Sequence, residues 1–247
     1  MRALPELLLG QIHAALGDKL LGFYLVGSLV TGDFDAASSD VDLIAVLTSE
    51  LTDDEVQRLD DLHADLIRTR PNLEDRIEVI YIAAARLKGD VQDYTIAEIS
   101  PGEPFHVKLI HHDEWTVNWH VLREQGITLF GVDPKTLVDP IPHAKIVRVV
   151  RDLCQQPPDW TTPTHLPGQG YWILTLCRSL RLIRTDEFVS KKQAAHWAAE
   201  QFPEWAWLIE KPLAWRVVGS EPDDDALALY PQIQRLDAFL LDQVNRS

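Results

Sequence analysis

Apolar positions in the first half of the chain switch between helical and strand-like spacing. Leucine, isoleucine and alanine recur three and four positions apart within residues 5–17, which predicts an amphipathic helix. Thr52 precedes three acidic residues, which predicts a helix from Thr52 to Arg68. Short apolar runs with the length of buried strands occur at residues 21–26, 40–47 and 76–83. This strand–helix–strand order favours a domain in which helices pack on a small sheet.

The pattern changes after the middle of the chain. Prolines and a glycine mark loops within 86–113, and residues 115–124 have helical spacing. Three prolines between positions 134 and 142 indicate a connection between domains. Beyond them a polar, proline-bearing loop is expected at 155–170, and helical patterns without a strand pattern occur at 144–153, 171–183, 191–201 and 224–244. We therefore predict an α+β fold, with a small mixed sheet and helices in residues 1–143 and an all-α domain in residues 144–247.

Composition and charge narrow the classes of partner. The chain has 247 residues, of which 46% are hydrophobic and 25% charged, as in ordinary globular proteins. The formal net charge is −15, which opposes nucleic-acid binding and favours cationic partners. The two cysteines have no metal-binding spacing, and neither a signal peptide nor a membrane-spanning stretch is visible. We expect a cytoplasmic, monomeric protein without a nucleic-acid or membrane partner.

Two carboxylates interrupt the second apolar run. Asp40 and Asp42 are two positions apart, so on a strand they point to the same face. A divalent cation would relieve their repulsion, and ligation by oxygen atoms alone suits Mg²⁺. Gly27 and Ser28 lie at the end of the preceding strand, where backbone N–H groups and a hydroxyl can bind phosphate. A third acid, Glu78, lies within the third apolar run, so together these residues predict one nucleoside triphosphate site.

This combination of Gly-Ser, eleven intervening residues, Asp-x-Asp and a third strand acid resembles the nucleotidyltransferase superfamily of the DNA polymerase β type. The resemblance implies that Asp40 and Asp42 bind Mg²⁺ and that Gly27 and Ser28 contact the phosphates of ATP. It says little about the acceptor, because a fold does not determine a substrate.

Two longer segments, "LREQGITLFGVDPKTLVDPIP" and "ILTLCRSLRLIRTDEFVSKKQAAHWA", are similar to the aminoglycoside 3''/9 adenylyltransferases, the streptomycin and spectinomycin resistance enzymes. That resemblance spans nearly the whole chain. It implies that Glu78 is the general base and that Arg178 and Lys191 contact ATP from the helical domain. The site would then lie between the two domains.

The residues that contact the acceptor in that family are less well matched in this chain. The family has an acid shortly before the "LTLxR" helix, where this chain has Gly168, and nearby Asp159 is the available substitute. The family also has a tryptophan that touches substrate, for which Trp115 and Trp119 are the candidates. A missing carboxylate matters because it is a natural partner for a cationic aminoglycoside.

These observations predict an enzyme that transfers AMP from ATP, with Mg²⁺, to a hydroxyl of an aminoglycoside-like, cationic small molecule and releases pyrophosphate. Three alternatives remain open. The acceptor could be another metabolite or a protein hydroxyl, the protein could be a non-catalytic nucleotide sensor, or it could extend nucleic acid without a template. The sequence does not distinguish ATP from GTP.

Overall fold

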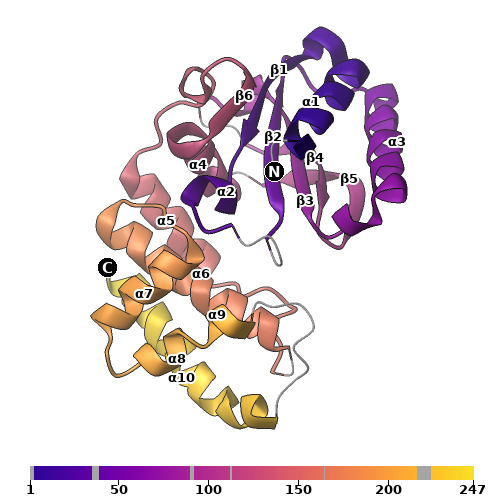
Figure 1. The fold of residues 1–247 in the computed structure, drawn as a ribbon. Helices are drawn as coiled ribbons and strands as arrows, with labels where there is room; N and C mark the ends of the chain where they lie inside the picture. The colour runs from indigo at the N-terminus through magenta and orange to yellow at the C-terminus, as the bar shows by residue number, and fades with distance from the viewer. Residues whose placement is uncertain (1–2, 35–38, 90–91, 112, 164, 216–223) are drawn as a thin grey trace. The chain divides into compact units, whose positions relative to one another are not determined.

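Two units make up the chain in the computed structural model, which describes all residues except 1–2, 35–38, 90–91, 112, 164 and 216–223 (Figure 1). The first unit ends at Ile141, and the second begins at Pro142. The first contains helices α1 (Ala3–Leu16), α2 (Ser28–Thr31), α3 (Asp53–Thr69) and α4 (Thr116–Gln125) and strands β1 (Leu20–Leu25), β2 (Val41–Leu47), β3 (Ile77–Ala83), β4 (Tyr94–Ser100), β5 (Glu103–Ile110) and β6 (Ile127–Gly131). The second contains helices α5 (His143–Cys154), α6 (Leu166–Thr185), α7 (Lys191–Gln201), α8 (Ala206–Ile209), α9 (Pro212–Trp215) and α10 (Asp224–Arg246). The expected α+β class is confirmed.

The six strands of the first unit form one mixed sheet in the order β5-β4-β3-β2-β1-β6. Only β2 and β3 are parallel among the paired strands; the other pairs are antiparallel. Helix α3 makes the crossover between β2 and β3, as a parallel pair requires. In consequence, β2 and β3 begin at the same end of the sheet, and Asp42 is paired with Glu78 there.

Both faces of the central strands are covered, which explains their nearly continuous apolar sequences. Leu43, Ala45 and Leu47 pack in the cluster that includes residues of α1 and α3, whereas Ile44 and Val46 pack in the cluster that includes residues of α4 (Figure 1). Because side chains alternate along a strand, Asp42 lies on the same face as Ile44. The carboxylate therefore lies at the end of the strand, beyond the last apolar contact on that face.

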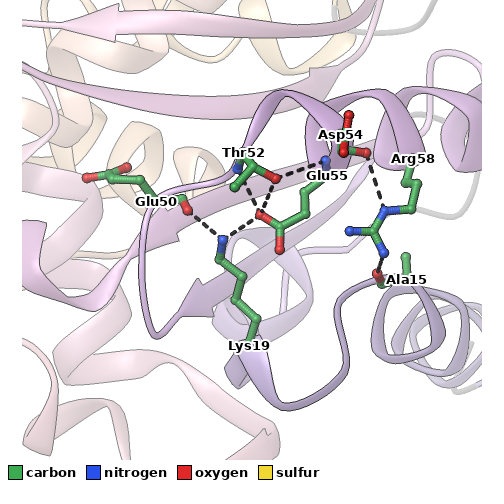
Figure 2. Close-up of polar contacts among 7 residues, drawn as sticks. All are labelled: Ala15, Lys19, Glu50, Thr52, Asp54, Glu55 and Arg58. Atoms are coloured by element: carbon green, nitrogen blue, oxygen red, sulfur yellow. Dashed lines mark hydrogen bonds and ion pairs between the residues drawn. The ribbon is translucent and has the colours of Figure 1, made fainter.

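A polar network anchors the start of α3 (Figure 2). Thr52 is the N-cap residue, as predicted: its hydroxyl accepts a hydrogen bond from the Glu55 N–H, and the Glu55 carboxylate accepts one from the Thr52 N–H. Lys19 forms an ion pair with Glu55 and donates a hydrogen bond to the Glu50 carbonyl. This capping box satisfies backbone donors that the first turn of a helix leaves open, and it ties the crossover helix to the start of β1.

Helix α6 is the centre of the second unit and packs against α5, α7, α9 and α10. It begins at Leu166, whereas the sequence predicted a loop up to residue 170, so that part of the loop prediction is wrong. Pro167 is compatible with a first helical turn, where no N–H is needed for the helix. Gly170 lies against α9, where a Cβ built on the glycine would be 3.4 Å from the Pro212 Cα.

The sequence also missed β4 and β5, which form a hairpin within the segment assigned to loops. Gly102, with φ of +78°, makes the turn between the strands. A proline within the first positions of β5 obscured the strand pattern, but Pro104 lies on the edge strand, where a missing donor is tolerated. Among the helices of the described ranges, none is both long and apolar enough to cross a membrane.

Candidate active site

Three carboxylates from two neighbouring strands converge at one end of the sheet. Asp42 and Glu78 are cross-strand partners on β2 and β3, and Asp40 precedes β2 directly. One carboxylate oxygen from each of the three lies within 4.8 Å of the others, and all three residues are partly buried. The structure thus brings together the acids that the sequence assigned to one site, although β2 begins at Val41 rather than at Asp40.

Gly27 lies directly against the Asp42 carboxylate of this cluster. Its φ of +70° lies in the left-handed region that favours glycine, and a Cβ built on it would overlap the Asp42 carboxylate. The backbone around it is held by a 3.0 Å hydrogen bond from the Val26 N–H to the Asp42 carbonyl. Any other residue at this position would therefore displace Asp42.

Ser28 follows as the first residue of α2. Its Oγ is shielded from solvent and has no hydrogen-bond partner in the part of the chain that the structure describes. A buried hydroxyl without a partner is costly, and a bound ligand is one way to satisfy it. This observation fits the predicted role of Ser28 in holding phosphate.

Glu78 has a strongly perturbed carboxyl group. Burial is the largest cause that raises its pKa, to about 8, because removal from water disfavours the charged form. The negative charges of Asp42 and Asp40 raise the pKa further, in that order. Without a cation, Glu78 is thus mostly protonated at neutral pH. A strongly shifted pKa of this kind is typical of functional sites.

Glu98 on β4 is a neighbour that the sequence analysis missed, because the strand itself was not recognised. It pairs with Ile80 across the sheet and so shares the face of Glu78, whose pKa it raises by charge repulsion. Only 5% of its own surface is exposed, and two side chains on β5 contact its carboxylate. His106 Nε2 lies 3.3 Å and Lys108 Nζ 3.6 Å from Glu98 Oε1. The alternation in "YTIAEIS" before a Pro-Gly turn was the signal for this strand.

The donor set of Asp40, Asp42 and Glu78 fits a hard divalent cation. All three offer carboxylate oxygens, the type of ligand that Mg²⁺ prefers, and a cation would offset the repulsion that raises the pKa of Glu78.

In the helical unit, the two predicted nucleotide contacts lie near aromatic rings. The Arg178 guanidinium lies over the ring of Phe188, 4.8 Å from its centroid. Lys191 is the first residue of α7, and its Nζ lies 3.9 Å from the centroid of the Tyr171 ring. Tyr171 and Arg178 are two helical turns apart on α6 and share one face.

The sequence analysis did not single out Trp160, which packs against the same tyrosine. Its ring centroid lies 4.9 Å from that of Tyr171, and 47% of its surface is exposed. The Tyr171 ring thus contacts Lys191 on one side of the cluster and the exposed Trp160 indole on another. An exposed indole of this kind is a candidate surface for stacking by a ligand ring. Predicted Asp159 is the preceding residue and is exposed.

Gly168, where the family resemblance implies an acid, is buried in the first turn of α6. A Cβ built there would lie 2.6 Å from His165 Nδ1 and 2.8 Å from the Trp160 carbonyl oxygen. A carboxylate would fit only if this turn moved. The local packing therefore explains why this chain has glycine rather than an acid at position 168.

Trp115 and Trp119, the predicted substrate contacts, both pack in the apolar cluster between α4 and the sheet. They are 9% and 6% exposed, respectively. The indole N–H of Trp119 donates a 2.8 Å hydrogen bond to the buried Tyr94 hydroxyl. This placement favours a role in the core for both rings, and their contact with substrate stays a prediction.

Comparison with known proteins identifies related adenylyltransferases. The family model "Aminoglycoside adenylyltransferase, C-terminal domain" matches residues 136–241. Proteins of Staphylococcus aureus strains Mu50 and N315, both named spectinomycin 9-adenylyltransferase, are 25% identical over 255 residues, covering 94% of this chain and 90% of theirs. The chain is similar to the aminoglycoside adenylyltransferases over nearly its whole length. The enzyme class expected from the sequence, a nucleotidyltransferase that transfers an adenylyl group, is thereby confirmed.

A solved structure shows the same adenylyltransferase fold. The crystal structure of spectinomycin adenyltransferase AAD(9) from Enterococcus faecialis with ATP and spectinomycin superposes with a TM-score of 0.74 at 18% identity. The match covers 96% of both chains, so both units of this chain belong to the shared fold.

Proposed function

We propose that this adenylyltransferase transfers AMP from ATP to a hydroxyl of a cationic small molecule of the spectinomycin type and releases pyrophosphate. The observation that carries the proposal is the convergence of Asp40, Asp42 and Glu78 next to the Gly27-Ser28 turn, where the Ser28 hydroxyl has no hydrogen-bond partner among the described residues. The names of the relatives point to spectinomycin as the acceptor. The formal net charge of −15 is consistent with a cationic acceptor.

Glu78 is proposed as the general base. The acceptor oxygen forms a new bond to the α-phosphorus of ATP, its proton passes to the Glu78 carboxylate, and the bond from the α-phosphorus to the bridging oxygen of pyrophosphate breaks. Burial and the neighbouring aspartates raise the pKa of Glu78 in the metal-free site, and a bound cation would release that proton and leave the carboxylate free to accept the one from the acceptor. Glu98 lies beside it on the neighbouring strand, with His106 Nε2 and Lys108 Nζ 3.3 and 3.6 Å from its Oε1.

Asp40 and Asp42 are proposed to hold Mg²⁺, while Gly27 and Ser28 bind phosphate oxygens of ATP. The ion would neutralise charge on the triphosphate as pyrophosphate leaves. Gly27 contributes by allowing the Asp42 carboxylate to lie against the backbone. Arg178 and Lys191 are proposed to contact the nucleotide, and replacing either by alanine should raise the KM for ATP more than it lowers kcat.

For the acceptor, we propose Trp160 as a contact, because it is the exposed member of the aromatic pair that carries Lys191. Asp159 remains a candidate counter-charge. The buried Gly168 offers no carboxylate, so this chain should discriminate among aminoglycosides differently from relatives with an acid there.

The test is pyrophosphate release from ATP and Mg²⁺ with separate acceptors: spectinomycin, streptomycin and other aminoglycosides. We expect release with spectinomycin. Glu78→Gln should keep ATP binding and lower kcat by about 10²–10⁴-fold, the usual contribution of a general base. Glu74→Gln, which changes an exposed acid just before the same strand, is the matched control and should retain activity.

Other outcomes would redirect the proposal. ATP binding without release for any acceptor would favour the sensor, and release only with a different hydroxyl compound would keep the chemistry and change the substrate. Near-normal turnover by Glu78→Gln would refute the assignment of the base.

A further inference from the structure

A cavity of about 330 Å³ lies within the helical unit, bordered by the end of α5, the first half of α6 and the middle of α10. Its size is within the range of small-molecule sites in proteins. None of its lining residues belongs to the carboxylate cluster or to the predicted nucleotide contacts. The cavity is therefore lined by none of the residues proposed to bind the metal or the nucleotide in the transfer reaction.

Asp237 on α10 brings a carboxyl group to the wall of this cavity. Its Oδ1 is shielded from solvent and has no hydrogen-bond partner, and it forms no ion pair with lysine or arginine, in the portion of the chain whose structure is described. Burial raises the pKa of Asp237 to about 7. Asp237 is partly buried, and a carboxylate withdrawn from water without a counter-ion destabilises a fold, so a bound cation is a physical reason for its presence.

Gln169 on α6 adds a second acceptor to the wall. Its Nε2 donates hydrogen bonds of 2.8 and 2.7 Å to the carbonyls of Thr162 and Pro163, which determines the orientation of the amide. Its Oε1 is left without a partner among the described residues, although only 4% of the residue is exposed. Because both of these atoms are acceptors, a matching ligand must carry hydrogen-bond donors.

The rest of the wall is neutral and partly aromatic. Trp172 lines the cavity with most of its indole buried, and the remaining polar groups there include Thr161, Tyr230 and Gln234. An indole face attracts a cation, and amide and hydroxyl groups accept its hydrogen bonds. We propose that this cavity binds a small organic cation, through an alkylammonium or alkylguanidinium group, with Asp237 as its counter-ion.

The experiment titrates the full chain, labelled with ¹⁵N at its eight tryptophans, with ethylguanidinium and follows the indole N–H resonances. The Trp172 signal is assigned by its loss in Trp172→Phe. We expect a saturable shift of that signal, and no comparable shift with ethylurea, which has the same shape without the charge. Asp237→Asn should weaken binding at least about tenfold.

Asp242→Asn is the matched control, because it removes a surface carboxylate from the same helix, paired only with Arg246. It should leave ethylguanidinium affinity unchanged. Ala238→Phe provides a second test that leaves the charge intact: Ala238 is an exposed residue that lines the cavity, and a larger side chain there should block the ligand.

The proposal is overturned if the native chain shows no saturable shift, if ethylurea binds as well as ethylguanidinium, or if the Asp237→Asn and Asp242→Asn variants bind equally. Unchanged binding by Ala238→Phe would also overturn it, whether or not the Asp237 variant folds.

Discussion

Binding of Mg²⁺ at the carboxylate cluster should release a proton from Glu78. In the metal-free site, burial and the charges of Asp42 and Asp40 raise the pKa of Glu78 to about 8. The folded chain then holds this proton more tightly than the unfolded chain does. The metal-free protein should therefore lose stability as the pH rises from the ordinary carboxyl range toward 8.

The size of the effect follows from the titration curve. A group with a pKa of about 8 is about 90% protonated at pH 7. A divalent cation among three carboxylates favours the ionised form, because it replaces repulsion by attraction. If the cation lowers the pKa below about 6, each ion bound at pH 7 releases at least about 0.8 of a proton. Above about pH 9 the release should approach zero, because Glu78 is already ionised.

Isothermal titration of Mg²⁺ into the protein at pH 7, in two buffers with different ionisation enthalpies, measures the number of protons released. Glu78→Gln should still bind Mg²⁺ through the aspartates but release almost no proton. Glu74→Gln, the exposed control, should behave as the native chain. Absence of release from the native protein, or equal release from Glu78→Gln, would show that Glu78 does not hold the proton that the cation displaces.

Three further predictions concern other positions. His63 is 1% exposed, and burial lowers its pKa to about 4. The free energy of unfolding should therefore fall by about 3 kcal/mol as the pH falls from about 6.5 to 4, because over this range the unfolded chain gains the proton. Urea unfolding of the native protein and of His63→Gln, which does not titrate, checks this. Gly27→Ala should lower the Mg²⁺ affinity measured by calorimetry at least about tenfold, because the methyl group displaces Asp42. Gly32→Ala, which is also at positive φ but in open space, should leave that affinity unchanged. Equal losses in the two variants would implicate backbone strain alone. Thr52→Ala should cost about 1 kcal/mol of stability in thermal unfolding, because α3 loses its capping box, and an unchanged melting temperature would contradict that reading.

The sequence predicted the carboxylate cluster because its signals are local. Asp40 and Asp42 are two positions apart, Thr52 is three positions from Glu55, and each relation follows from the geometry of one strand or one helix end. Glu78 was placed beside them because strand–helix–strand order makes neighbouring parallel strands. Local periodicity and capping thus determined most of the elements and the chemistry of one site.

Tertiary packing decided what local patterns do not encode. Trp119 was a candidate substrate contact, but its N–H meets the Tyr94 hydroxyl from a strand that the sequence did not reveal. Glu98 lies beside Glu78 only because β4 pairs with β3.

The cavity in the helical unit has the same origin. Gln169 and Asp237 are 68 positions apart in sequence, and they border one cavity because α6 and α10 pack against each other. Whether a buried polar atom finds a partner depends on every element around it. The spacing of residues along the chain therefore predicted the nucleotide chemistry, and only the packed fold determined which polar groups lack a partner among the described residues.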